Sequence, residues 1–241
     1  MKFTFQAYKE MIDLLKENGY AISDYYGYEQ YDKVAILRHD VDMDLNKALE
    51  MAKYEHQLGI KTTYFVLLTS DFYNVFSEKN EQILKEIMSL GHTIGLHFDE
   101  TKYEDCDDIT EAIEQEIYIL QKCLGKQVGT VSMHRPSKKA LDENWIISNG
   151  TVINSYSTEF FREFKYVSDS RGHWREDING LIKSNTYNRL HILSHPIWYN
   201  EKERSVKQCL EEFVSSARSQ RYKTLDDNIR DLDQIMLSED E

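Results

Sequence analysis

The sequence contains little cysteine and little proline, with three cysteines and two prolines in 241 residues. The cysteines Cys106, Cys123 and Cys209 are odd in number and form no CxxC pair, which argues against a disulfide framework and against a thiolate zinc site. No stretch rich in glycine, serine or proline separates two parts of the chain. We therefore expect a single domain over 1–241 in a reducing, cytoplasmic setting.

Long apolar runs and positive charge are also scarce. No run approaches the roughly 18 consecutive apolar residues of a membrane span. Lys9, Glu10 and Asp13 stand where a secretory signal has an unbroken apolar segment. The 29 Lys and Arg residues face 42 Asp and Glu residues, giving a net charge of -13 that opposes binding to nucleic acid or to an anionic membrane. We expect neither a nucleic-acid partner nor membrane insertion.

Short runs rich in β-branched and aromatic residues alternate with apolar residues at helical spacing. Strands are predicted at 34–37, 62–68, 93–98, 128–133, 151–154, 165–168 and 190–194. Helices are predicted around 8–15, 45–52, 83–90, 113–124 and 141–147, with a long closing helix from 206 onward and a solvated tail at 237–241. This alternation predicts βαβ units, and hence an α/β fold with a parallel sheet.

Polar residues follow the ends of these predicted strands. They are Asp40 and Asp42 after the first strand, His97 and Asp99 at the third, His134 and Arg135 at the fourth, and His195 at the last. In a closed or nearly closed parallel barrel the C-terminal strand ends form one rim, so we expect these residues to converge.

Asp40 and Asp42 are one residue apart, so in an extended segment their carboxylates share a face and repel each other. A divalent cation at one carboxylate relieves this repulsion and leaves the other free as a base. Two histidines and one carboxylate form a common ligand set for a catalytic metal. Asp42 and His97 are the first two candidate ligands. Asp44 is interpreted instead as the cap of the helix that follows.

Five segments carry a family resemblance: LRHDVD, GHTIGLHFD, MHRP, SDSRGHW and ILSHP, spread over about 34–196. In this order they resemble the motifs of NodB-type polysaccharide deacetylases, carbohydrate esterase family 4. They resemble more closely a divergent branch found among capsule and O-antigen biosynthesis proteins. The resemblance implies a distorted (β/α) barrel of about seven parallel strands and a divalent metal ion, with zinc expected. It implies hydrolysis of an N-acetyl group from an amino sugar in cell-surface polysaccharide biosynthesis.

The resemblance also implies roles for individual residues. Asp40 matches the catalytic base and Asp42 and His97 match metal ligands, while Arg135 matches the arginine that orients the base. His195 matches the histidine that protonates the leaving amine, and Asp169 matches the carboxylate that tunes it. Trp174 resembles the aromatic wall beside the sugar. Trp198, shortly after His195, is a second candidate for sugar contact.

Thr101 departs from the family pattern, because it stands where a second metal-binding histidine is expected. His134 or Asp99 can replace that histidine, and we favour His134. The departure keeps a second function open, a catalytically inactive carbohydrate-binding or scaffold protein on the same barrel. A hydrolase of another C–N bond, such as a deformylase, is a third. The sugar and its carrier stay open, and a homodimer is compatible with the sequence.

Overall fold

The computed structural model describes residues 1–103, 105–106 and 108–236, so the predicted tail at 237–241 lies outside the described residues. The chain divides into two compact units, Met1–Glu201 and Lys202–Glu241. The expectation of one domain over 1–241 stays a prediction. Within the described part of the chain, no helix combines the length and the apolar character needed to cross a membrane.

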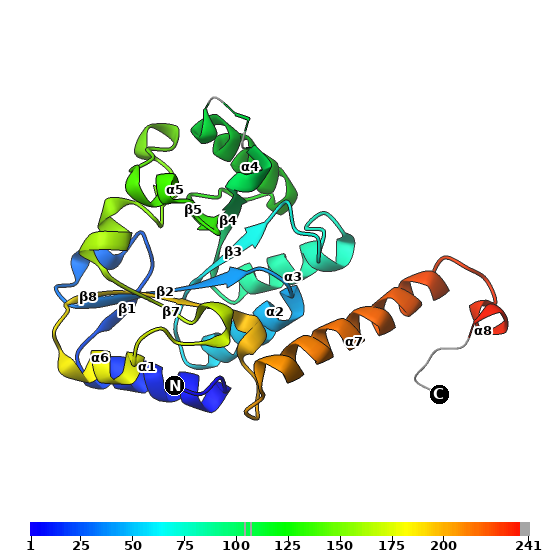
Figure 1. Ribbon diagram of the computed structural model, residues 1–241, viewed down its shortest axis with the longest axis horizontal. Coiled ribbons are helices and arrows are strands. Elements are labelled where there is room, and N and C mark those ends of the chain that lie inside the picture. The colour runs from blue at the N-terminus through cyan, green and yellow to red at the C-terminus, as the bar shows by residue number, and fades with distance from the viewer. Residues whose placement is uncertain (104, 107, 237–241) are drawn as a thin grey trace. The chain divides into compact units, whose positions relative to one another are not determined.

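The first unit contains one parallel sheet. Its strands are β1 (Ala21–Ser23), β2 (Val34–Val41), β3 (Thr63–Leu67), β4 (Thr93–Asp99), β5 (Thr130–His134), β6 (Ile153–Asn154), β7 (Lys165–Ser168) and β8 (Arg189–Ser194). They follow the order β6-β5-β4-β3-β2-β8-β7, with β1 paired to β2 off this path. The seven strands of the path form a curled half-barrel (Figure 1). This confirms the predicted distorted (β/α) barrel.

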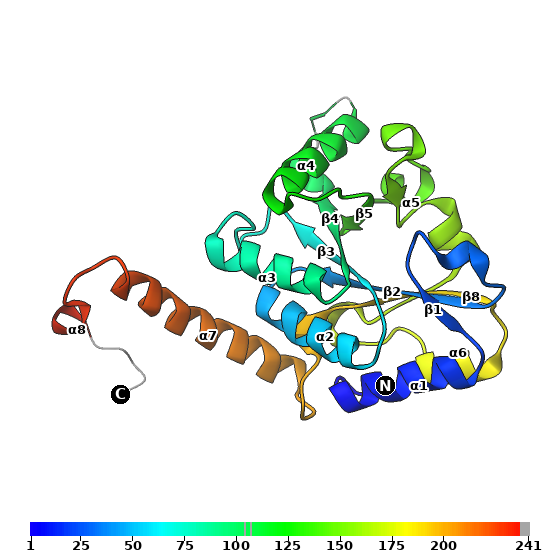
Figure 2. The same ribbon diagram turned by 180° about the vertical axis from the view of Figure 1, so that it is seen from behind.

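Helices connect and cover these strands. They are α1 (Phe5–Glu17), α2 (Leu45–Gln57), α3 (Glu78–Ser89), α4 (Ile109–Leu124), α5 (Lys138–Asp142) and α6 (Ile178–Ser184). Helices α2, α3 and α4 follow one another around one face of the sheet (Figure 2). The carboxylate of Asp44 accepts a hydrogen bond from the backbone N–H of Asn46 at 2.8 Å, which confirms Asp44 as the cap of α2.

The second unit consists of α7 (Val206–Asp226) and α8 (Leu232–Ile235). Helix α7 begins with a capping box, in which Ser205 and Gln208 each bind the other's backbone N–H group. The predicted closing helix is therefore confirmed.

Strand β2 extends beyond the predicted 34–37 to Val41, and all of its residues are buried. The extension occurs because β3 pairs with β2 from Arg38 onward, and β8 pairs with it as far as His39. Polar residues therefore continue a strand whose apolar part alone was visible in the sequence pattern. Alternation along β2 places Arg38 and Asp40 on one face of the sheet and His39 on the other.

One other prediction was wrong, and one strand was missed. The helix expected at 141–147 is replaced by α5, which ends at Asp142. Ser137 starts this helix early by accepting a hydrogen bond from the N–H of Ala140, and Ile147 is buried in an isolated bridge to Val152. Strand β1, inside the tyrosine-rich segment before β2, was not predicted. Its residues pair with the start of β2, a contact that no local pattern reveals.

Candidate metal centre and active site

Asp42, His97 and His134 come together although they lie far apart in the sequence. Asp42 follows the end of β2, His97 lies in β4, and His134 is the last residue of β5. Each offers one ligand atom, and the three atoms lie within 4.8 Å of one another. This grouping is the one expected at the C-terminal rim of a parallel barrel.

The distances between these atoms suit a tetrahedral metal ion. Asp42 Oδ1 lies 3.2 Å from His97 Nε2 and 3.4 Å from His134 Nδ1. The two histidine nitrogens are 3.2 Å apart. Ligands about 2.1 Å from a tetrahedral zinc ion are about 3.4 Å from each other, so the three atoms have the required spacing. Asp42 Oδ1 is a buried oxygen without a hydrogen bond of acceptable geometry, as expected for an atom that faces a cation.

The charge state of Asp42 also fits a metal ligand. Burial by itself raises the pKa of a carboxyl group, but the nitrogens of His134 and His97 hold the pKa of Asp42 well below its ordinary value. Its side chain keeps 25% of its exposure, whereas that of His97 keeps 2%. The anionic ligand therefore lies on the side of the site that solvent reaches.

Asp40 lies beside this triangle and is paired with Arg38. Arg38 Nη2 donates a hydrogen bond to Asp40 Oδ2 at 2.9 Å, and both side chains are almost fully buried. Asp40 Oδ2 is also 3.7 Å from His97 Nε2. The second oxygen, Oδ1, has no hydrogen-bond partner among the described residues. One oxygen of Asp40 is thus held in place while the other remains available to accept a proton.

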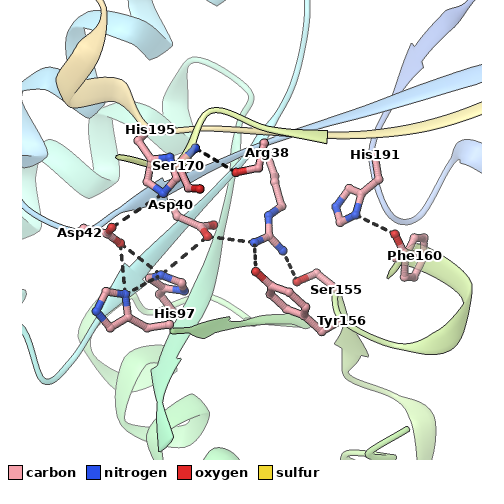
Figure 3. A network of polar contacts seen from close by, with 12 residues as sticks. Arg38, Asp40, Asp42, His97, Ser155, Tyr156, Phe160, Ser170, His191 and His195 are labelled. Carbon is pink, nitrogen blue, oxygen red and sulfur yellow. Dashed lines mark hydrogen bonds and ion pairs between the residues drawn. The ribbon is translucent and has the colours of Figure 1, made fainter. Parts of the chain in front are cut away.

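Arg38 is itself held from several sides. Its Nη1 donates to Ser155 Oγ at 2.5 Å, and its Nη2 lies 3.3 Å from the hydroxyl of Tyr156. The guanidinium also packs over the rings of Phe65 and Tyr156. Figure 3 shows Arg38 with Ser155 and Tyr156 on one side and Asp40 on the other. Asp42, His97 and His195 are gathered beyond Asp40.

His195 closes the other side of the site. Its Nδ1 lies 2.6 Å from Asp169 Oδ1, its backbone N–H donates to Asp169 Oδ2 at 3.1 Å, and its Nε2 is 3.8 Å from Asp42 Oδ2. Burial lowers the pKa of an imidazole, but the carboxylates of Asp169 and Asp42 outweigh it and raise the pKa of His195 to about 9. The free Nε2 atom therefore carries a proton at neutral pH and points toward Asp42.

No family model matches the sequence, and the comparison with curated proteins finds no match. Among solved structures, the chain is similar to a polysaccharide deacetylase from Bacillus cereus, with 16% identity, 76% of this chain and 88% of that chain covered, and a TM-score of 0.47. It is similar to a family 4 carbohydrate esterase from Bacillus anthracis at 15% identity, with 87% and 85% covered and a TM-score of 0.44. A mutant of the peptidoglycan deacetylase PdaC from Bacillus subtilis aligns at 14% identity, with 77% and 85% covered and a TM-score of 0.46. These are solved structures of the family that the motifs resemble.

The geometry favours His134 over Asp99 as the third ligand. Asp99 Oδ1 accepts hydrogen bonds from both the backbone N–H and the hydroxyl of Thr101, at 3.1 Å and 2.7 Å. The side chains of Asp99 and Thr101 are therefore hydrogen-bonded to each other. His134 instead lies on the neighbouring strand with Nδ1 3.4 Å from Asp42 Oδ1, within the group that could hold a metal ion.

The structure does not place Arg135 in contact with Asp40. Its side chain is exposed, and among the described residues no ion pair joins it to Asp40. Its backbone is left-handed, with a φ of 50°, at the point where the chain leaves β5. Arg38 occupies the position next to Asp40 instead. A sequence signal for it exists, because Arg38, Asp40 and Asp42 alternate and so share one face of the strand.

The two predicted sugar contacts find no support. Trp174 and Trp198 are both buried, each with 6% of its surface exposed, and neither offers an open ring face. Trp198 lies in the short turn after His195, where the chain passes back into the core. A tryptophan next to a site residue fills space as readily as it binds sugar, so sugar contact at these positions stays a prediction.

A buried network behind the site was also missed. Glu55, from α2, accepts hydrogen bonds from Tyr8 at 2.5 Å, Tyr64 at 2.6 Å and Thr62 at 2.7 Å, and lies 2.9 Å from His39 Nε2. The other nitrogen of His39 lies 2.9 Å from Ser194 Oγ. His39 therefore ties β2 to β8 on the face of the sheet opposite to Asp40.

Proposed function

We propose that this chain is a divalent-metal-dependent hydrolase that removes an N-acetyl group from an amino sugar in cell-surface polysaccharide biosynthesis. The observation that carries the proposal is the placement of Asp40 and His195 on two sides of the Asp42–His97–His134 triangle. A protein that only binds carbohydrate has no need for a proton acceptor, a proton donor and three metal-ligating side chains in contact with one another.

Amide hydrolysis makes three demands: the water must lose a proton, the carbonyl must be polarised, and the departing nitrogen must gain a proton. A divalent cation held by Asp42, His97 and His134, with zinc expected from the nitrogen-rich ligand set, supplies a Lewis acid for the carbonyl and makes water more acidic. The other two demands fall to this chain's own side chains.

Asp40 is the proposed base. The ion pair with Arg38 fixes the orientation of Asp40, and Oδ1, which has no hydrogen-bond partner among the described residues, takes the proton of the attacking water. His195 is the proposed acid. Asp169 binds Nδ1, which keeps the imidazole oriented and leaves the proton on Nε2 for the amine that departs.

The first experiment is a metal and turnover measurement on the same preparation. Protein purified without chelator should contain about one equivalent of a divalent metal and should release acetate from N-acetylated amino sugars. Asp40→Asn should abolish acetate release while keeping the metal. Metal content near zero after incubation with several divalent ions would overturn the proposal and favour the inactive carbohydrate-binding protein. Release of formate from N-formylated sugars, without acetate release, would favour the deformylase.

A further inference from the structure

Arg135 and Arg171 differ from the other arginines of the Met1–Glu201 unit. Both are exposed, and neither has a side-chain hydrogen bond or ion pair with any residue that the structure describes. Each of the others has a polar partner: Arg38 has Asp40, Arg162 has Asp142, Arg175 has Ser170 and Arg189 has Glu159. Within this unit, these two guanidinium groups are therefore available to an anionic ligand.

Both arginines also stand next to the proposed active site. Arg135 directly follows His134, and Arg171 comes shortly after Asp169. His134, Asp42, His195 and Asp169 form a continuous chain of contacts of 3.4, 3.8 and 2.6 Å, so the two arginines belong to loops at its two ends. Lys138 and Lys139, also exposed and without an ion pair among the described residues, add positive charge on the Arg135 side.

Both arginines have left-handed backbones, with φ values of 50° and 63°. For a residue with a Cβ atom this conformation is energetically unfavourable. Glycine would avoid that cost, and Gly172 follows Arg171 with a φ of 66°. Arginine at these two strained positions thus retains a charged side chain where the backbone favours glycine.

These observations suit recognition of a phosphoryl group. A guanidinium presents paired N–H donors that match two phosphoryl oxygens, and a phosphoryl group attached to the anomeric carbon of an amino sugar lies close to a neighbouring acetamido group. We infer that Arg135 and Arg171 bind a phosphoryl group carried by the sugar substrate, so that the enzyme prefers a phosphorylated or diphosphate-linked sugar to a neutral one. The identity of the substrate in this inference rests on the proposed function. The test does not, because it measures binding of a phosphoryl compound without turnover.

The test is binding of inorganic pyrophosphate to the full chain by isothermal titration calorimetry. Arg135→Gln and Arg171→Gln should each weaken binding by about tenfold, because each removes one charge-assisted donor pair. Arg135→Lys and Arg171→Lys should lose less affinity, since lysine keeps the positive charge but lacks the paired N–H donors of the guanidinium. Arg162→Gln is the matched control, as it removes an exposed, already paired guanidinium from the same unit. The Arg162→Gln variant should bind pyrophosphate with the same affinity as the wild type.

Titrations with N-acetylglucosamine 1-phosphate and UDP-N-acetylglucosamine then distinguish a single phosphoryl group from a nucleotide diphosphate. Absence of saturable pyrophosphate binding, or equal affinity in the wild type and both glutamine variants, would overturn the inference. Arginine-dependent binding without acetate release from any sugar would overturn the proposed function but leave standing the binding of a phosphoryl group by the two arginines. Acetate release together with pyrophosphate binding that does not depend on the arginines would support the proposed function and overturn the inference.

Discussion

Arg38 Nη2 donates a hydrogen bond to Asp40 Oδ2 at 2.9 Å, between two side chains on the same face of one strand. Because both residues belong to β2, their separation is set by the pleat of a single strand. The proposed base is therefore oriented by its own strand, and Ser155 and Tyr156, which directly follow β6, form hydrogen bonds with the arginine.

Arg38→Gln should impair both folding stability and turnover. The substitution leaves the buried carboxylate of Asp40 without a cation, which costs about 3–5 kcal/mol of unfolding free energy. Urea unfolding measures this loss, and acetate release should fall by about a hundredfold or more in the protein that remains folded. Arg162→Gln, which removes an exposed ion pair, should change unfolding by at most about 1 kcal/mol. Normal stability and activity of Arg38→Gln would contradict the role given to this pair.

The metal ligands can be separated from their neighbours by elemental analysis. Asp42→Ala, His97→Ala and His134→Ala should each lose most of the bound metal, because a three-ligand site rarely survives the loss of one ligand. Asp99→Ala and Thr101→Ala should keep it, since these two side chains are bonded to each other. Metal loss in Asp99→Ala together with retention in His134→Ala would reverse the assignment of the third ligand.

Asp169→Asn should shift the pH dependence of turnover. His195 acts as an acid only while protonated, so activity falls as the pH rises through its pKa, which Asp169 and Asp42 raise to about 9 against the effect of burial. Removing the Asp169 carboxylate lowers this pKa, and the alkaline fall of kcat should move to lower pH. At pH 8 we expect a loss of about tenfold to a hundredfold. An unchanged alkaline limb would show that Asp169 does not act through His195.

Glu55 gives a prediction for stability that is independent of catalysis. Burial by itself raises the pKa of this carboxyl group, but His39 and the other donors lower it from the ordinary 4.5 to about 2. A depressed folded-state pKa means that Glu55 contributes its stability above about pH 4.5 and loses it as the pH falls toward 2.

Glu55→Gln should therefore lower the unfolding free energy by about 3 kcal/mol at pH 7, and the difference from the wild type should shrink between pH 4.5 and pH 3. Urea unfolding at a series of pH values measures this. Glu50→Gln is the control on the same helix, because its side chain is half exposed and pairs with Lys47. A gap between Glu55→Gln and wild type that stays constant down to pH 3 would contradict the linkage.

The sequence by itself determined the architecture and the residues at the rim. Strands alternating with helices bury their apolar faces in a parallel sheet covered by helices, so the α/β fold followed from periodicity, and the motif resemblance implied the barrel. The carboxyl ends of parallel strands meet at one edge, so Asp40, Asp42, His97, His134 and His195 were expected to meet there, and the structure brings them together.

Only the tertiary structure decided which of these side chains touch. Periodicity places a residue on a face but gives neither the strand order nor the direction in which a loop leaves a strand. The order β5-β4-β3-β2-β8 brings His134 to Asp42, and the left-handed turn at Arg135 leaves that arginine exposed, so Arg38 takes its place beside Asp40. Burial of Trp174 and Trp198, and the bond from Glu55 to His39, likewise depend on elements that the chain brings together only when it folds.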